Sequence, residues 1–382
     1  MKVVYCILGT FNSGGMERVL CNKANWLVNN AGYEVSIVTT DQKGRNPFFD
    51  FSPKIRMCDL QVNYTDLQGK NFVAKTIGFL RKQKLHRQKL QSLLDEIRAD
   101  VVVSMFGHEV SFLYRMRDGS KKVLEIHFSK YFRLQQQRGG VWWLADKWRT
   151  WKDQKYIRQY NKFVVLTHED KAYWGNLPNI EVIYNAATFT PSETARLENK
   201  RVLSVGRLTF QKGYDMLLEA WAKVYALHPN WKLTIVGGGE EHDALQQQIS
   251  RLGLTDTVEL KAPTSQIQEE YLSSSIYVLS SRFEGFGLVL VEAMRCGLPA
   301  VAFACKCGPR DIISHQQDGL LVTENDIIGL ANAICQLIEH PLLRKQMGQA
   351  AMCKICENFN EQNIMEQWRQ LFMRLTTNTN NL

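Results

Sequence analysis

Short apolar or β-branched runs alternate with longer helical patterns along the whole chain, and this alternation restricts the fold more than any other feature. It is typical of parallel sheets whose strands are joined by crossover helices. The expected strands of the first half are 2–8, 34–39, 101–105, 122–126 and 163–166. Those of the second half are 202–205, 232–236, 258–261, 276–280, 300–303 and 320–322. We therefore predict an α/β protein built from doubly wound sheets.

The chain is long enough for two such domains, since 382 residues is about twice a usual domain size. An irregular stretch at 183–191 precedes Arg201, where the strand and helix rhythm restarts. We predict one domain over 1–190 and a second over 198–360. The remaining residues, 361–382, begin with an amphipathic helical pattern that places Trp368 on its apolar face.

Composition excludes several classes of protein. No stretch approaches 18 uninterrupted apolar residues, and the apolar run 3–8 is too short for a secretory signal, so we expect a cytosolic chain. Nine cysteines, an odd number, argue against a disulfide framework. The close pairs Cys305/Cys307 and Cys353/Cys356 have no neighbouring His or further Cys at zinc-site spacing. We expect reduced thiols and no metal.

Positive charge is concentrated in the first half. Residues 1–190 contain 29 Lys and Arg against 17 Asp and Glu, whereas the rest contains 18 against 21. Segment 70–94 is basic without an acidic residue and carries interleaved apolar residues, and segment 130–162 combines nine basic residues with four tryptophans, Trp142, Trp143, Trp148 and Trp151. Such segments favour an anionic membrane surface, although solvated helix faces packed on their own sheet remain the alternative.

Glycine-rich loops follow several expected strands. Segment 9–18 is a glycine loop that opens a helix, 205–213 carries two cationic side chains, and 236–240 contains a triple glycine. Backbone amides at such positions suit an anion or a sugar hydroxyl. Arg207 and Lys212 could both reach one diphosphate, although solvated loop charges explain them equally well. Neither a dinucleotide fingerprint nor a Walker loop is present.

The sharpest motif is segment 280–294. Glu284 lies in a glycine loop, and Glu292 follows eight positions later, just over two helical turns away. Both carboxylates could therefore address a ligand lying over the helix N-terminus. A capping Glu followed by an ordinary helical Glu is the alternative.

Together these segments resemble family 4 of the retaining GT-B glycosyltransferases. The resemblance runs in order from residue 9 to residue 322 and includes Cys307-Gly308-Pro309-Arg310-Asp311 and Asp318-Gly319-Leu320-Leu321-Val322. It implies an acceptor-binding domain over 1–190, a nucleotide-sugar-binding domain over 198–360, and a helix over 361–382 that crosses back to the first domain.

The resemblance also implies roles for individual residues. Arg207 and Lys212 would bind the donor diphosphate, Glu292 the ribose hydroxyls and Glu284 the transferred sugar. His127 would meet the donor sugar from the first domain. Further donor contacts would come from Gly14, Gly15, Gly237 and the amides of Phe286, Gly287 and Leu288. Asn185 matches a hinge residue, although Tyr184 and Ala186 depart from the usual Pro-Asn-Gly.

The implied reaction needs no metal cofactor. No Asp-x-Asp motif occurs, so cationic side chains and a helix dipole would stabilise the leaving diphosphate. We expect transfer of a hexose or N-acetylhexosamine, most often UDP-linked in this family, to a lipid-linked or nascent polysaccharide acceptor in capsule, exopolysaccharide or O-antigen synthesis. The enzyme would sit peripherally on the inner face of the cytoplasmic membrane.

Two enzymatic alternatives stay open at this stage. A GDP-mannose-dependent mannosyltransferase fits the same motifs, and a nucleotide-sugar epimerase shares the two-domain architecture but needs no acceptor. A nucleic-acid-binding protein would explain the basic half. It would not explain the Glu284 to Glu292 segment, so we expect no nucleic-acid partner.

Overall fold

A computed structural model describes residues 1–136 and 140–377, apart from the side chains of 136, 141 and 142. The described chain forms two compact units. Unit 1 comprises Met1–Leu166, Asp170–Tyr184 and Gln362–Leu382, and unit 2 comprises Thr167–Glu169 and Asn185–Glu361. The main part of unit 2 thus begins at Asn185, five residues before the end of the predicted first domain.

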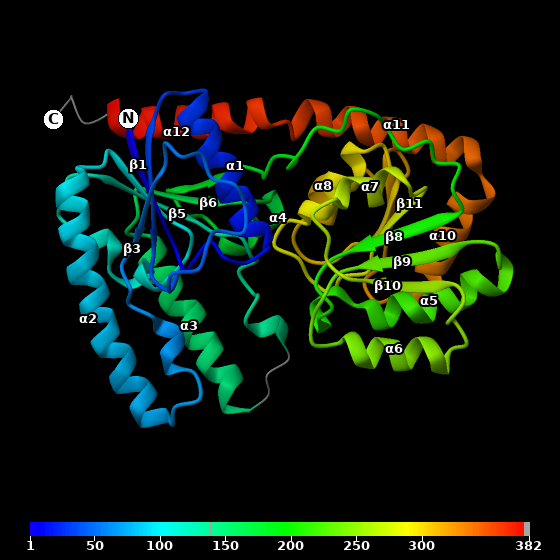
Figure 1. Cartoon of the computed structure of the whole chain (residues 1–382), viewed down its shortest axis with the longest axis horizontal. Coiled ribbons are helices and arrows are strands. Elements are labelled where there is room, and N and C mark those ends of the chain that lie inside the picture. Colours follow the sequence, from blue (N-terminus) through cyan, green and yellow to red (C-terminus); the bar gives the residue numbers. More distant parts are fainter. Residues whose placement is uncertain (137–139, 378–382) are drawn as a thin grey trace. The chain divides into compact units, whose positions relative to one another are not determined.

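Unit 1 contains a seven-stranded, all-parallel sheet in the order β3-β2-β1-β4-β5-β6-β7 (Figure 1). Its strands are β1 (Lys2–Ile7), β2 (Glu34–Thr39), β3 (Arg56–Asp59), β4 (Val101–Ser104), β5 (Lys121–Glu125), β6 (Lys162–Val165) and β7 (Ile180–Val182). Its helices are α1 (Gly15–Asn29), α2 (Phe72–Ile97), α3 (Val141–Ile157), α12 (Glu361–Thr377) and, shared with unit 2, α4 (His168–Trp174).

Unit 2 repeats the arrangement with six parallel strands in the order β10-β9-β8-β11-β12-β13. These strands are β8 (Arg201–Val205), β9 (Lys232–Val236), β10 (Val258–Lys261), β11 (Ile276–Leu279), β12 (Ala300–Phe303) and β13 (Gly319–Val322). Its helices are α5 (Tyr214–Leu227), α6 (His242–Arg251), α7 (Ile267–Leu272), α8 (Leu288–Arg295), α9 (Pro309–Ile312), α10 (Ile327–Glu339) and α11 (Pro341–Asn358).

Both sheets reverse their strand order beside the first strand, next to β1 in unit 1 and β8 in unit 2. In doubly wound sheets, ligands bind outside the carboxyl ends of the strands at such a reversal. The prediction of an α/β fold with two doubly wound, Rossmann-like sheets is confirmed. The loops that follow the strands are therefore the places to look for a site.

The sequence analysis did not predict two strands, β3 and β7, which lie at the two edges of the first sheet. β3 has charged residues at both ends, Arg56 and Asp59, so it has no apolar run, and β7 has only three residues. Hydrogen bonding to one neighbour forms these strands, and local residue type gives little sign of it.

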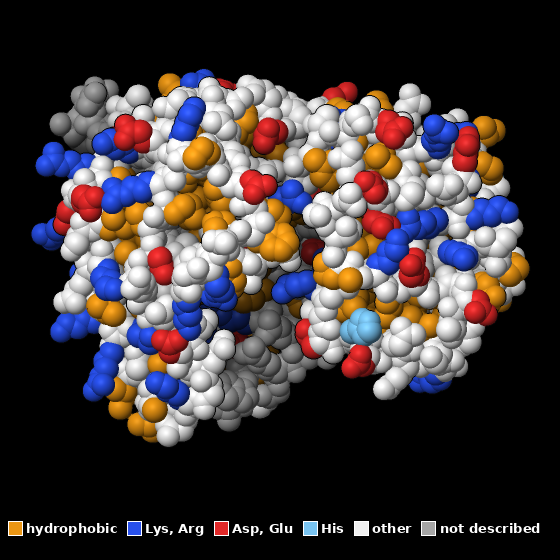
Figure 2. Space-filling model, in the orientation of Figure 1, with side chains coloured by type: hydrophobic (Ala, Val, Ile, Leu, Met, Phe, Trp, Pro, Cys, Tyr) orange, Lys and Arg blue, Asp and Glu red, His pale blue; other side chains and the backbone are white. Residues whose placement is uncertain are grey.

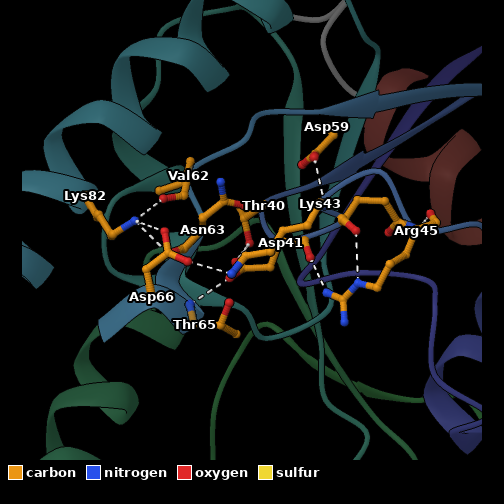
Figure 3. Close-up of polar contacts among 11 residues, drawn as sticks. Thr40, Asp41, Lys43, Arg45, Asp59, Val62, Asn63, Thr65, Asp66 and Lys82 are labelled. Carbon is orange, nitrogen blue, oxygen red and sulfur yellow. Dashed lines mark hydrogen bonds and ion pairs between the residues drawn. The ribbon is translucent and has the colours of Figure 1, made fainter. Parts of the chain in front are cut away.

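A polar network fixes the loops beyond β2 and β3 to helix α2 (Figure 3). The buried carboxylate of Asp41 accepts hydrogen bonds from the Thr40 hydroxyl and the Thr65 amide, both at 2.8 Å. Lys82 of α2 donates to the carbonyl oxygens of Val62 at 2.5 Å and Asn63 at 2.6 Å. The middle of α2 is thereby anchored to its own sheet.

From Gln362 onward, helix α12 belongs to unit 1, although it follows unit 2 in the sequence. In α12, Ile364, Met365, Trp368, Leu371 and Phe372 are buried. The Trp368 ring lies against Lys23 of α1, with the Lys23 Nζ 3.7 Å from the ring centroid. Helix α12, which lies within the predicted segment 361–382, therefore packs on the first unit. No helix in the described part of the chain is long and apolar enough to cross a membrane.

Replacing Trp368 should destabilise unit 1 strongly. Trp368→Ala removes a side chain that is 1% exposed and uncovers a buried ammonium, so we expect a loss of about 3–5 kcal/mol in the free energy of unfolding. Denaturant unfolding followed by fluorescence measures this loss. Gln367→Ala, on the exposed face of the same helix, is the control and should change stability by less than about 0.5 kcal/mol. Equal stabilities would contradict the packing of α12 on unit 1.

Candidate functional site

In unit 2, the loops that follow β8 and β9 are packed backbone against backbone. The Gly206 amide donates to the Val236 carbonyl at 3.0 Å, and the Leu208 amide donates to the Gly238 carbonyl at 3.0 Å. A Cβ on Gly237 would lie 1.8 Å from the Gly206 carbonyl oxygen. The predicted segments 205–213 and 236–240 therefore form one surface, and Gly237 is there because no side chain fits.

The loop after β11 joins this surface through side-chain and main-chain contacts. Gln211 donates to the Phe283 carbonyl at 3.0 Å, and the Arg282 amide donates to the Gln211 carbonyl at 2.8 Å. Gly213 has a positive φ of 63°, and a Cβ there would lie 2.2 Å from the Ser280 carbonyl oxygen. Three strand ends thus hold Arg207, Lys212 and the Glu284 loop together.

Lys212 and Glu284, both predicted site residues, form an ion pair. The Lys212 Nζ lies 2.7 Å from Glu284 Oε1, which also accepts a hydrogen bond from the Ser281 hydroxyl at 2.6 Å. The Glu284 side chain is 7% exposed and that of Lys212 is 13% exposed. The pair is therefore mostly shielded from water, and each charge is held in place by the other.

Arg207 and Glu292 are placed differently. Arg207 follows β8 and is exposed, and no ion pair of its guanidinium occurs among the described residues. Glu292 is buried on α8, where its carboxylate accepts hydrogen bonds from the Thr188 hydroxyl at 2.5 Å and the Tyr271 hydroxyl at 2.9 Å. Arg207 is thus available to a ligand, while Glu292 already has two protein partners.

The predicted loop Phe286, Gly287 and Leu288 leads directly into α8. Gly287, at the N-cap, has a φ of 92°, and Leu288 is the first helical residue. A Cβ on Gly308 would lie 1.9 Å from the Phe286 carbonyl oxygen, so the loop after β12 presses against this turn. The N–H groups of the first turn of a helix have no partner within that helix, which makes this end attractive to an anion.

In unit 1, Gly14 and Gly15 open α1 after β1, as the sequence predicts. Gly14 is the N-cap in an extended conformation, and a Cβ there would lie 2.3 Å from Glu17 Oε2. The Glu17 side chain is buried and accepts a hydrogen bond from Asn12 at 3.4 Å. The glycine loop therefore folds tightly over an acidic side chain at the start of the helix.

His127 follows β5 in unit 1 and lies next to the buried ion pair of Glu125 and Lys23. Its Nε2 lies 3.0 Å from Glu125 Oε1, without the alignment of a hydrogen bond. Glu125 Oε1 also lies 2.5 Å from the Lys23 Nζ, and both of these side chains are almost fully buried. Burial alone would raise the pKa of the Glu125 carboxyl, but Lys23 and His127 lower it to about 2.

Sequence reasoning missed four partners of the predicted site residues. Glu125 lies within 3.0 Å of His127 and pairs with Lys23. The hydroxyls of Thr188 and Tyr271 donate hydrogen bonds to Glu292. No local motif marks them, because each contact joins residues that are far apart in the chain. A charged residue in the apolar strand Val123–Ile126 is the one sign that could have drawn attention to Glu125.

The structure also places Asn185 and the segment Cys305–Cys307. Asn185 is buried and is the first residue of the main part of unit 2. Cys305 and Cys307 are buried thiols that flank the exposed Lys306. Among the described residues, no three His, Cys, Asp or Glu side chains gather closely enough to hold a metal ion.

The two doubly wound units define the GT-B fold of glycosyltransferases. The structure of TarM of S. aureus, determined in a complex containing UDP, matches with a TM-score of 0.81 and 18% identity and covers 97% of this chain and 99% of its own. A sucrose-phosphate synthase from Thermosynechococcus elongatus matches with a TM-score of 0.82 and 20% identity over 98% of this chain and 99% of its own. At these identities the likeness shows the fold.

Sequence comparison places the chain in a family. Residues 13–188 match the model of Glycosyltransferase Family 4, and residues 187–352 match that of Glycosyl transferases group 1. An amylovoran biosynthesis glycosyltransferase, AmsD, of Erwinia amylovora is 37% identical over 97% of this chain and 99% of its own length. An uncharacterised glycosyltransferase of Haemophilus influenzae is 32% identical over 96% and 99%. This chain belongs to glycosyltransferase family 4.

Two neighbouring glycines offer a direct test of the unit 2 surface. Gly237→Ala places a methyl group 1.8 Å from the Gly206 carbonyl oxygen and must push the two loops apart, so we expect a loss of about 1–3 kcal/mol in the free energy of unfolding. Gly238→Ala is the matched control, because its Cβ would meet only the Pro263 ring at 3.4 Å. Thermal or denaturant unfolding compares them. A Gly237 variant as stable as the Gly238 variant would refute the close packing of these loops.

Proposed function

We propose that this glycosyltransferase moves a hexose or an N-acetylhexosamine from a UDP-linked donor to a lipid-linked or nascent glycan, with retention of the anomeric configuration. The observation that carries the proposal is the joint placement of Arg207, Lys212 and Glu284 at the carboxyl edge of the second sheet. A cation pair for a diphosphate thus stands beside a carboxylate that can orient sugar hydroxyls.

The same residues would support departure of the diphosphate without a metal cofactor. The exposed Arg207 guanidinium and the Lys212 ammonium would bind the phosphate oxygens, and the N-terminus of α8 would add its dipole. Because Lys212 is already held by Glu284, it needs little reordering when the donor binds.

Retention would follow from attack on the same face as departure. The acceptor oxygen forms its bond to the anomeric carbon while the bond from that carbon to the diphosphate oxygen breaks. The acceptor proton passes to the leaving phosphate. No enzymatic nucleophile is required, and Glu284 acts by positioning the sugar.

Relatives support an acceptor in bacterial glycan assembly. One of them, from Campylobacter jejuni, is an N-acetylgalactosaminyltransferase acting on an undecaprenol-diphosphate-linked glycan and is 25% identical over 97% of this chain and 98% of its own length. The Rhizobium meliloti protein LpsD, a lipopolysaccharide core glycosyltransferase, is 30% identical over 98% of each chain. We infer a role in the synthesis of an extracellular or cell-surface polysaccharide, such as exopolysaccharide, capsule or lipopolysaccharide.

Two helices of unit 1 have the surface expected for contact with an anionic membrane. On α2, the exposed large apolar residues are Phe72, Val73, Ile77, Phe79, Leu80 and Leu85. On α3, they are Trp143, Leu144, Trp148 and Trp151, and each of the three tryptophans has a lysine ammonium within 4.2 Å of its ring centroid. In Figure 2, apolar and basic side chains intermingle over the region where α2 lies in Figure 1.

The exposed surface of α2 carries basic as well as apolar side chains. Lys82 and Lys89 donate to carbonyl oxygens. Four other basic residues of α2, Lys75, Arg81, Lys84 and Arg87, and Lys70 just before the helix, are exposed beside the apolar side chains. This arrangement suits partial insertion into lipid headgroups. The predicted segment 130–162 includes residues 137–139 and the Trp142 side chain, which lie outside the described residues. We propose peripheral attachment to the inner leaflet through 70–94 and 130–162.

Two alternatives to the proposed function, one with another donor and one with another reaction, would give different results in solution. A GDP-mannose-dependent transferase would be stabilised by GDP, and an epimerase would convert a nucleotide sugar with no acceptor present. The identity of the stabilising nucleotide and the need for an acceptor therefore separate these possibilities from the proposed function.

The donor site can be tested by thermal shift with EDTA present. We expect UDP at about one hundred times its dissociation constant to stabilise the wild type by about 2.7 kcal/mol. Arg207→Ala should bind UDP at least about tenfold more weakly, which corresponds to a loss of about 1.4 kcal/mol of binding free energy. Arg251→Ala, an exposed arginine on α6, is the control and should bind as the wild type does. No stabilisation by any nucleotide or nucleotide sugar would refute the proposal.

Membrane attachment can be tested by sedimentation with lipid vesicles. We expect the protein to pellet with vesicles that contain phosphatidylglycerol, less with pure phosphatidylcholine, and less again at high salt, which screens the basic side chains. Leu80→Ser should weaken binding, since Leu80 is 64% exposed on the apolar face of α2. Leu342→Ser, at a residue of unit 2 that is 78% exposed, should not. Equal losses in the two variants would disprove the assignment of the surface.

A further inference from the structure

The lysine of the Lys212–Glu284 pair in unit 2 lies against the bare backbone of the loop after β8. A Cβ on Gly206 would lie 2.9 Å from Lys212 Cε and 2.9 Å from the hydroxyl oxygen of Tyr214, which is buried. The lysine stem and the tyrosine therefore both pack against Gly206. Packing as well as the ion pair fixes the course of the lysine side chain, so its position does not depend on the carboxylate alone.

The cationic side chains of this site differ in how far their charge is compensated. Lys212 has the Glu284 carboxylate 2.7 Å away, and Arg282 has that of Asp215 at 2.6 Å. Arg207 has no carboxylate partner among the described residues. Because the Lys212–Glu284 pair is mostly shielded from water, its two charges act with little screening. A diphosphate that approaches Lys212 therefore meets a pair whose net charge is zero.

The charges of the pair also act on the groups buried around it. Burial raises the pKa of the Cys305 thiol, Glu284 raises it further, and Lys212 lowers it. Burial likewise raises the pKa of the Tyr214 hydroxyl, and Glu284 adds to this rise. The surroundings of the pair therefore screen its charges poorly.

Glu284 keeps one carboxylate oxygen for a ligand. Lys212 and the Ser281 hydroxyl both donate to Oε1, and no hydrogen bond to Oε2 occurs in the part of the chain that the structure describes. An ionised carboxylate only accepts hydrogen bonds, and the hydroxyl groups of a sugar can donate them. A nucleotide sugar can therefore offer Oε2 a partner, whereas the sugar-free diphosphate has no hydroxyl at that end of the molecule.

We propose that the Lys212–Glu284 pair makes the donor site select the intact nucleotide sugar over the free nucleoside diphosphate. Glu284 compensates the charge of Lys212 and so weakens the attraction for a diphosphate alone. This loss is offset only when sugar hydroxyls donate to Glu284. The inference rests on the proposed function, which places the diphosphate at Arg207 and Lys212. In consequence the nucleoside diphosphate left after transfer competes weakly with the next donor.

Replacing Glu284 by glutamine isolates the effect of its charge. The amide oxygen of Glu284→Gln can still accept from Lys212 and Ser281, while the negative charge is gone. Isothermal titration calorimetry measures the affinity of each protein for UDP, UDP-glucose and UDP-N-acetylglucosamine. We expect the variant to bind UDP about threefold more tightly, the scale of a partly screened ion pair. The ratio of UDP-sugar affinity to UDP affinity should fall by about fivefold, because the charged acceptor for the sugar is lost.

Asp318→Asn is the matched control, because it removes the negative charge from another mostly shielded lysine pair of unit 2. Asp318 Oδ2 lies 3.1 Å from the Lys354 Nζ. Asp318 directly precedes β13, so it lies at the amino ends of the parallel strands, whereas the candidate site lies at their carboxyl ends. This variant should bind UDP and both UDP-sugars as the wild type does.

A second comparison repeats the test without the lysine. Lys212→Met leaves the Glu284 carboxylate uncompensated, so the double variant Lys212→Met with Glu284→Gln should bind UDP more tightly than Lys212→Met alone. Thermal unfolding first establishes that all variants are folded.

A UDP affinity that stays the same or falls on loss of the Glu284 charge, in the wild type or in the Lys212→Met background, would overturn the inference. So would an unchanged ratio of UDP-sugar to UDP affinity in Glu284→Gln. A wild type that binds neither UDP nor a UDP-sugar would instead refute the proposed function on which the inference rests.

Discussion

The close approach of bare backbone at the ends of parallel strands is the constraint on which the candidate donor site depends. The Gly206 carbonyl occupies the space where Gly237 would carry a side chain, and the Ser280 carbonyl does the same at Gly213. Because these loops touch through their main chains, their spacing is set by peptide geometry and hydrogen bonds. This scaffold fixes the backbone positions of Arg207, Lys212 and Glu284. Binding a diphosphate and a sugar at one place requires such fixed positions.

The two units place their charged side chains in different environments. In unit 2, Lys212 and Glu284 form a mostly shielded pair at the edge of the sheet, close to the exposed Arg207. In unit 1, Lys23 and Glu125 are paired deep in the interior, and the exposed basic residues lie on α2 among apolar side chains. The first arrangement suits a small anionic ligand, whereas the second separates a buried structural charge from a surface suited to lipid.

Much of the fold could be predicted from the sequence, because buried parallel strands appear in it as apolar runs and the loops that follow them contain glycine motifs. The strands Glu34–Thr39 and Lys232–Val236 were predicted with their observed bounds, while the edge strands β3 and β7 were missed because they lack such runs. For the site, the motifs located Lys212 and Glu284 but could not show that they pair. The partners of Glu292 and the charges beneath His127 come from distant segments, so only the folded chain brings them together.

The packing of α12 on unit 1 has a consequence for the synthesis of the protein. Domains generally fold as they leave the ribosome, with the N-terminal part first. Here Trp368, which covers Lys23, is translated after the whole of unit 2. Unit 2 can therefore fold on the nascent chain while the Lys23 ammonium of the first unit is still uncovered, and the first unit is completed only when α12 has left the ribosome.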